Sequence, residues 1–85
     1  MTASIGGSIR NQQGDPIAGI SVKLVHEPTA SAFAKTSDAS GQYQFDSVKV
    51  GGPYVLSVNH EGINPEECKD INLKIDEVFI HHFTV

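Results

Sequence analysis

The chain has 85 residues, six of them basic and ten acidic, which gives a formal net charge of −4. A chain of this length forms one small domain in which nearly every large apolar side chain must reach the core, so little room remains for a deep pocket. The shortage of lysine and arginine argues against a nucleic-acid partner and against docking on anionic lipid.

Apolar and polar residues alternate in short runs, and clusters of glycine, proline, aspartate and serine separate these runs. Such a pattern is typical of a β-sandwich. The first run, Ser4–Arg10, places Ile5 and Ile9 on one face of a strand. We expect a tight hairpin loop after it, formed by Gly14, Asp15 and Pro16.

The segment Gly19–His26 is the clearest strand with one buried face, and we expect it at the centre of a sheet. Its core residues are Ile20, Val22 and Leu24. The alanine-rich segment Thr29–Ser37 has no clear inward face, so we expect a short edge strand there.

Two aromatic residues define the next strand. Asp38, Ser40 and Gly41 supply a turn, after which Tyr43 and Phe45 point toward the core. A second turn and another strand follow. The turn consists of Gly51, Gly52 and Pro53, and the inward residues of the strand are Tyr54, Leu56 and Val58.

The last part of the chain contains two further runs. Gly62 ends the preceding strand, and a solvated connection with Glu66 and Glu67 leads to a sixth run. The inward residues of this run are Ile71, Leu73 and Ile75. In the seventh run, Phe79, Phe83 and Val85 carry more apolar volume than Val78, Ile80 and Thr84, so we expect the first three to face inward.

Several short motifs carry a family resemblance over essentially the whole chain. They are Gly7, the turn Gly14-Asp15-Pro16, Ala18-Gly19 with Val22 and Leu24, Asp38-x-x-Gly41-x-Tyr43-x-Phe45, Gly52-x-Tyr54-x-Leu56-x-Val58, and Gly62. In this order they resemble the carboxypeptidase regulatory-like domain. The resemblance implies a seven-stranded antiparallel Greek-key β-sandwich of the transthyretin-like, or prealbumin-like, type. We expect residues 1–85 to form one such domain.

The segment VKVGGPYVLSV, residues 48–58, is most similar to copies of this domain at the N-terminus of TonB-dependent outer-membrane transporters. That similarity implies a place on the periplasmic side of the bacterial outer membrane, as part of a larger protein. It also implies a non-catalytic interaction or spacer domain with no cofactor. We expect its partner to be another protein, or the rest of the parent chain, bound at an exposed strand edge. The expected edges are Thr29–Ser37 and the N-terminal strand.

The sequence offers little for membrane insertion or disulfide formation. No apolar run is long enough to cross a membrane, and the first residues lack the pattern of a signal peptide. Cys68 is the single cysteine, so no internal disulfide can form. Two glutamates precede it and disfavour its thiolate, so we expect no reactive thiol.

The four histidines are candidate metal ligands. His81 and His82 are neighbours on a predicted strand, so their side chains leave opposite faces and cannot chelate one ion together. A site would need His26 or His60 from another strand, and no Cys, Asp or Glu lies at a reinforcing interval. The short loop at Asp38 lacks the length of a calcium-binding loop. We therefore expect no metal.

Catalytic residues are also not expected. The acidic group of Glu61, Glu66, Glu67 and Asp70 falls in a polar, exposed region. Enzymes of the transthyretin fold that hydrolyse hydroxyisourate carry a C-terminal Tyr-Arg-Gly-Ser signature, whereas this chain ends in His-His-Phe-Thr-Val. No serine lies in a nucleophile elbow. A hydrolase would require His26, His60 and a carboxylate to converge.

A carbohydrate-binding or adhesin-type sandwich is the alternative function. Such modules hold sugars on exposed, flat aromatic side chains. The chain has no tryptophan, and we expect Tyr43, Phe45 and Tyr54 to be needed in the core. The sequence therefore favours a protein partner over a glycan.

Overall fold

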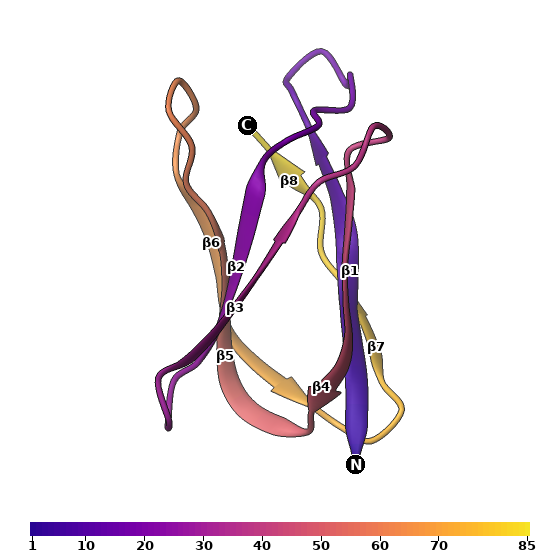
Figure 1. The fold of residues 1–85 in the computed structure, drawn as a ribbon, viewed down its shortest axis with the longest axis vertical. Coiled ribbons are helices and arrows are strands. Elements are labelled where there is room, and N and C mark those ends of the chain that lie inside the picture. Colours follow the sequence, from indigo (N-terminus) through magenta and orange to yellow (C-terminus); the bar gives the residue numbers. More distant parts are fainter.

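The computed structural model describes residues 1–85 and contains eight strands and no helix. The strands are β1 (Thr2–Arg10), β2 (Ser21–His26), β3 (Ser31–Thr36), β4 (Gln42–Lys49), β5 (Gly51–Val58), β6 (Glu66–Leu73), β7 (Val78–Ile80) and β8 (Phe83–Thr84). One sheet has the order β3-β2-β5-β6; the other has the order β4-β1-β7, with β8 also paired to β1. The two sheets face each other (Figure 1), so the expected β-sandwich is confirmed. No helix that could cross a membrane is present.

The core fills the space between the two inner faces. Fifteen buried apolar residues form one cluster. The largest fully buried side chains come from both sheets, namely Ile5 and Ile9 on β1, Val22 and Leu24 on β2, and Leu56 and Val58 on β5. Period-two alternation produces this arrangement, because every second side chain of a strand points to the same face. Each such side chain contributes roughly 1.5–3 kcal/mol through burial.

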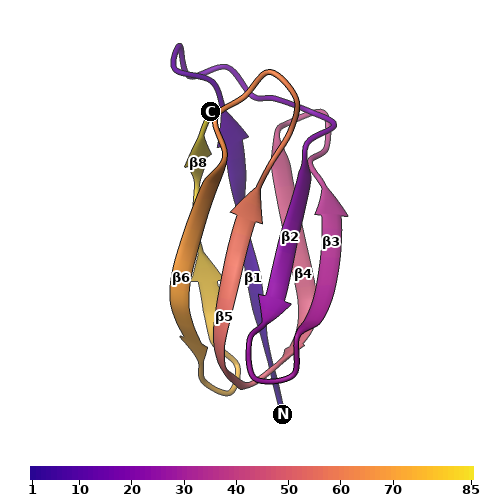
Figure 2. The same cartoon turned by 90° about the vertical axis from the view of Figure 1, so that its left-hand side faces the viewer.

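The positions of β2 and β3 agree with the sequence pattern. β2 lies between β3 and β5, and β3 forms one edge of its sheet. Figure 2 shows β3 at this edge, with β4 behind it in the second sheet. The predictions of a central strand at Gly19–His26 and an edge strand at Thr29–Ser37 are therefore confirmed.

The N-terminal strand is not an edge, so that prediction is wrong. β1 lies between β4 and β7. The loop after it does fold back, since Ile17 N–H donates to Ile9 O at 2.9 Å and Arg10 forms an isolated bridge with Pro16. However, the chain then crosses to the other sheet, so the first two strands do not form the expected hairpin. Alternation fixes the inward face of a strand but not its neighbours.

The last strand also differs from the expectation. It is split into β7 and β8, and both pair with β1 in parallel rather than antiparallel orientation. The chain reaches them through a turn beside the start of β1, where Ser4 N–H donates to Glu77 O and Asp76 N–H donates to Thr2 O. The sheet is therefore mixed, with eight strands in the molecule instead of seven. Phe83 is buried, while Val78 and Ile80 are exposed, as the apolar volumes predict.

β6 begins earlier than expected. Glu66 and Glu67 pair with Val58 and Ser57 of β5, so they belong to an edge strand and not to a loop. Ile71 and Leu73 are buried, but Ile75 lies in the following turn and is 55% exposed. The prediction that Ile75 faces the core is wrong, because the strand ends at Leu73.

Candidate functional site

Two of the depressions on the surface are lined by residues of several strands. The polar groove, of about 800 Å³, is lined by residues of β1 and β4, by Ile80 and His82, and by Lys35 and Thr36 of β3, and most of its lining is polar. The side groove, of about 470 Å³, lies where β3 and β4 form the edges of the two sheets, and most of its lining is apolar. These are the places where the domain could hold a ligand or partner.

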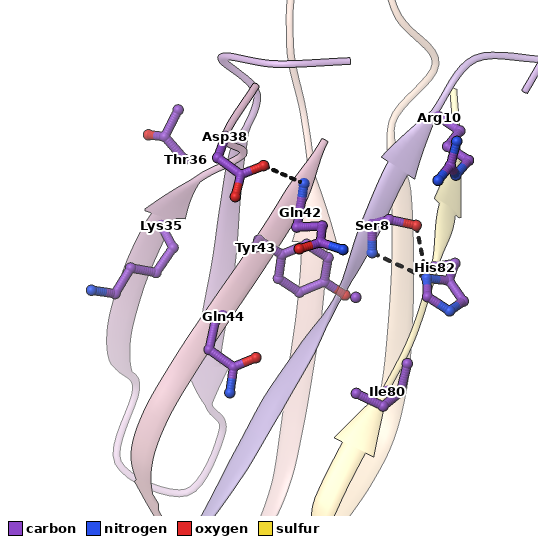
Figure 3. A pocket seen from close by; sticks show the side chains of 11 residues that line it. Ser8, Arg10, Lys35, Thr36, Asp38, Gln42, Tyr43, Gln44, Ile80 and His82 are labelled. Carbon is purple, nitrogen blue, oxygen red and sulfur yellow. Dashed lines mark hydrogen bonds between the residues drawn. The ribbon is translucent and has the colours of Figure 1, made fainter. Parts of the chain in front are cut away.

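Ser8 and His82 form a hydrogen-bonded contact in the polar groove (Figure 3). Ser8 N–H donates to His82 Nδ1 at 3.1 Å, and Ser8 Oγ lies 2.8 Å from the same nitrogen. Because Nδ1 accepts the backbone N–H, the ring proton of a neutral His82 is on Nε2. His82 lies in the break between β7 and β8, where β1 has no neighbouring strand on that side. Its ring takes the place of a strand carbonyl and accepts the hydrogen bond of the Ser8 backbone N–H. Nothing in the sequence indicates this pair, because the two residues are 74 positions apart.

A serine beside a histidine raises the question of nucleophilic catalysis. An activated serine needs a base whose lone pair is free for the hydroxyl proton, and a third group that orients the base. Here the Nδ1 lone pair already accepts the Ser8 backbone N–H, and Ser8 is buried. The His82 ring donates no hydrogen bond to a carboxylate that would orient it. The contact links β1 to the last strand.

Tyr43 fixes the same region from beneath. Its hydroxyl donates to His81 O, and burial raises the pKa of the Tyr43 side chain. A Cβ at Gly7 would lie 1.7 Å from His81 O, so only glycine fits between β1 and this carbonyl. The side chain of His81 packs edge-on against Phe83, with ring centroids 4.7 Å apart. Burial, and next the charge of His82, lower the pKa of His81, while Glu66 opposes this effect.

Two of the three predicted turns lie between strands, as expected. Asp38 Oδ1 accepts the N–H groups of Ser40 and Gln42 at 2.9 and 3.0 Å, which closes the turn before β4. Gly41 has a φ of 74°, and a Cβ there would lie 2.6 Å from Ile9 O. Gly14, Asp15 and Pro16 lie in the loop after β1. Gly51, Gly52 and Pro53 do not form the expected separate turn, because they are the first residues of β5, Gly51 already pairs with Leu73 of β6, and only Val50 separates β4 from β5.

Eight of the predicted core residues lie fully between the sheets. Each is at most 4% exposed: Ile20, Val22, Leu24, Tyr43, Phe45, Tyr54, Leu56 and Val58. The three aromatic rings among them are therefore covered by protein. None offers a flat face to solvent.

The other candidate ligands stay apart. His26 is paired with Tyr54 near the start of β5, with Nδ1 2.7 Å from Thr29 Oγ1, whereas His60 follows the last residue of β5. No three side chains of His, Cys, Asp or Glu gather as a metal site would require. In the acidic group, Glu67 pairs with Lys69 at 3.1 Å on the exposed edge strand β6. Cys68 is a free thiol, half-buried against the core.

The side groove has apolar walls and charged rims. Leu24, Phe45, Val48 and Tyr54 line it, and Phe33 of β3 stands beside it with 53% of its surface exposed. Phe33 is opposite Leu24 in the β2–β3 register, so its ring belongs to the inner face of the sheet but lies at the open side of the sandwich. The charged lining residues are Lys35, Asp46 and Lys49. A large exposed aromatic ring beside an apolar hollow is a feature of interaction surfaces.

The backbone of β3 is unpaired along this side. Ser37 N–H donates to Ile20 O, and the β2–β3 register runs without a shift from Ser31 to Thr36. In an antiparallel strand, successive residues direct their N–H and C=O groups to opposite sides. The groups of Ala32, Ala34 and Thr36 therefore point away from β2. All six side chains of β3 are exposed.

Comparisons with known proteins agree with this architecture. The family model of the carboxypeptidase regulatory-like domain matches residues 4–85. No curated protein matches the sequence.

Solved structures share the fold at low sequence identity. A candidate carbohydrate-binding protein from Bacteroides uniformis is 24% identical with a TM-score of 0.74, over 98% of this chain and 40% of that chain. The 5-hydroxyisourate hydrolase of Klebsiella pneumoniae is 14% identical with a TM-score of 0.69, over 94% and 90% of the two chains. The full-length major pilin SpaD of Corynebacterium diphtheriae is 11% identical with a TM-score of 0.71, over 99% and 30%. The chain thus has a transthyretin-like sandwich fold and spans 40% of the length of the first of these proteins.

Proposed function

The chain belongs to the carboxypeptidase regulatory-like domain family, and we propose that it is a non-catalytic interaction domain that binds a protein partner through the free edge of β3. The observation that carries this proposal is the combination of an exposed six-residue edge strand with an apolar groove beside it. A partner strand can extend such a sheet through backbone hydrogen bonds. The partner is a separate protein or another part of the chain that bears the domain.

We further propose that the domain is the periplasmic N-terminal extension of a TonB-dependent outer-membrane transporter. The segment 48–58, VKVGGPYVLSV, supports this assignment by its similarity to such extensions. A small β-sandwich with a free edge suits a role in which the domain holds a partner near the transporter or spaces the two apart.

The buried aromatic rings favour a protein partner over a sugar. Tyr43, Phe45 and Tyr54 are in the core and present no face to a glycan, which leaves Phe33 as the one mostly exposed aromatic ring. A catalytic role finds equally little support, because His26 and His60 lie near opposite ends of β5. A specific hit on a glycan array would reverse this preference.

Two experiments test the proposed function. The gene around this segment is read for a plug and β-barrel downstream, and their absence contradicts the transporter assignment. In the parent protein, the domain is deleted or carries Ala34→Pro, and substrate uptake and complex formation are measured. Proline at position 34 removes an N–H that faces away from β2, so the fold keeps its ladder while the edge loses a donor. We expect both changes to weaken complex formation. If uptake and complex formation are both unchanged, the domain acts only as a passive spacer.

A further inference from the structure

We propose that the β3 edge and the side groove together bind an extended partner segment in which an apolar residue and a carboxylate are two positions apart. This inference rests on the proposed function and specifies the chemistry of the partner. It follows from the direction of the backbone groups of β3 and from the side chains that flank the groove.

The backbone sets the shape of the partner. The N–H and C=O groups of Ala32, Ala34 and Thr36 point away from β2 and have no strand to pair with. A segment of five or six residues, about 20 Å long when extended, matches the length of β3. It would become the next strand of the β3-β2-β5-β6 sheet.

The side chains set the partner's sequence pattern. Phe33 and Lys35 are opposite Leu24 and Val22, so both lie on the inner face of the sheet and line the side groove. Partner residues directly across from them share this face and are therefore two positions apart. The residue across from Phe33 meets an exposed ring and the apolar walls, which favours an aliphatic or aromatic side chain. The residue across from Lys35 meets a cation.

The charge of the groove favours an acidic residue at the partner position across from Lys35. Lys35 and Lys49 both line the groove, against a single carboxylate from Asp46. The groove thus has a surplus of positive charge in a chain whose net charge is −4. A partner carboxylate binds more tightly in this electrostatic field, whereas a partner lysine binds more weakly.

The same lysines exclude a second copy of the chain as the occupant. Pairing of two β3 strands would bring a second Lys35 to a groove that already holds Lys35 and Lys49. An inward-facing charge on an edge strand is a common protection against such self-pairing. The edge therefore discriminates between partners.

The test uses three acetylated eight-residue peptides and the ¹⁵N-labelled 85-residue protein. The first peptide has valine and glutamate separated by one threonine, with serine and threonine elsewhere. The second replaces the glutamate with lysine. The third places valine and glutamate at adjacent positions, so that they point to opposite faces. Amide chemical shifts locate each peptide and give its affinity.

We expect the first peptide to shift amides of β3 and β4, and to bind about threefold to tenfold more tightly than the other two. Lys35→Glu should reverse the preference between the glutamate and lysine peptides. Lys23→Glu makes the same charge change on the outer face of β2, outside the groove, and should leave the preference unchanged.

Four results would overturn the inference: equal affinity for the three peptides, no binding up to millimolar concentration, shifts confined to the polar groove, or self-association through β3 in sedimentation. The proposed function is tested separately by Ala34→Pro in the parent protein. If that variant weakens the native complex while Lys35→Glu leaves the peptide preference unchanged, the edge is the docking site but the acidic pattern is wrong. If neither variant has an effect, both proposals fail.

Discussion

At the scale of single residues, the His82 ring accepts a hydrogen bond from the backbone at the break between β7 and β8. Ser8 N–H is buried and donates to His82 Nδ1. Removal of the ring leaves this N–H without its acceptor, and an unsatisfied buried donor costs about 1–3 kcal/mol. The polar groove admits water to this place, so the low end of that range applies.

His82→Ala should therefore lower the free energy of unfolding by about 1 kcal/mol, measured by urea denaturation. His82→Asn is the matched control, because the side-chain oxygen of asparagine can occupy the position of Nδ1 and accept the same N–H. It should restore most of the loss. Equal loss in both variants would show that the ring acts through packing and not through this hydrogen bond.

His81 makes the stability depend on pH. Its pKa in the folded protein lies below the ordinary value, first because of burial and then because of the charge of His82. As the pH falls, the unfolded chain therefore takes up a proton on this residue before the folded chain does, and stability falls. Unfolding in urea at about pH 7.5 and about pH 5.5 should show a smaller pH effect in His81→Gln than in the wild type. An equal pH effect in the two proteins would contradict this account.

Single-residue roles could be predicted from sequence where they depend on local geometry. Asp38 and Gly41 form their turn because the carboxylate reaches N–H groups two and four positions ahead. The link from Ser8 to His82, and the need for glycine at position 7 beneath His81 O, depend on residues at the far end of the chain. No local pattern could indicate them.

At the scale of elements, the alternation of apolar and polar residues predicted which side chains face the core, but not which strands lie next to each other. The inward residues of β2, β4 and β5 follow directly from a period of two. The pairing of β1 with β7 and β8 depends on where the chain re-enters the second sheet, and on the turn that brings Glu77 beside Ser4. A regular pattern of apolar residues carries no information on that path. The parallel orientation and the interior position of β1 were therefore not predictable.

The central role of β5 leads to a test at this scale. Leu56 is fully buried and faces Leu24 across the β2–β5 pair. Leu56→Ala should lower the free energy of unfolding by about 2–5 kcal/mol, because it removes buried methyl groups and leaves a cavity. Val78→Ala, at a site that is 64% exposed, should change it by less than about 0.5 kcal/mol. Similar effects at the two sites in urea denaturation would mean that the sheets do not pack as described.

At the scale of the whole molecule, most of the large apolar side chains pack in the core, and the edge strand β3 keeps Phe33 exposed beside a groove. Fifteen residues form one core, the candidate metal and acid–base residues stay apart, and the free side of β3 borders the side groove. The sequence predicted that Thr29–Ser37 is an edge. It could not predict the side groove, because β3 and β4 belong to different sheets and only their placement side by side creates it.

Amide hydrogen exchange at Ala32, Ala34 and Thr36 reports whether β3 is the docking edge. These three N–H groups should exchange quickly in the isolated 85-residue protein, while those of Phe33 and Lys35, which face β2, should be protected. When the proposed partner is bound, the three should become protected as well. Exchange that stays fast at all three positions in that complex would show that β3 is not the docking edge.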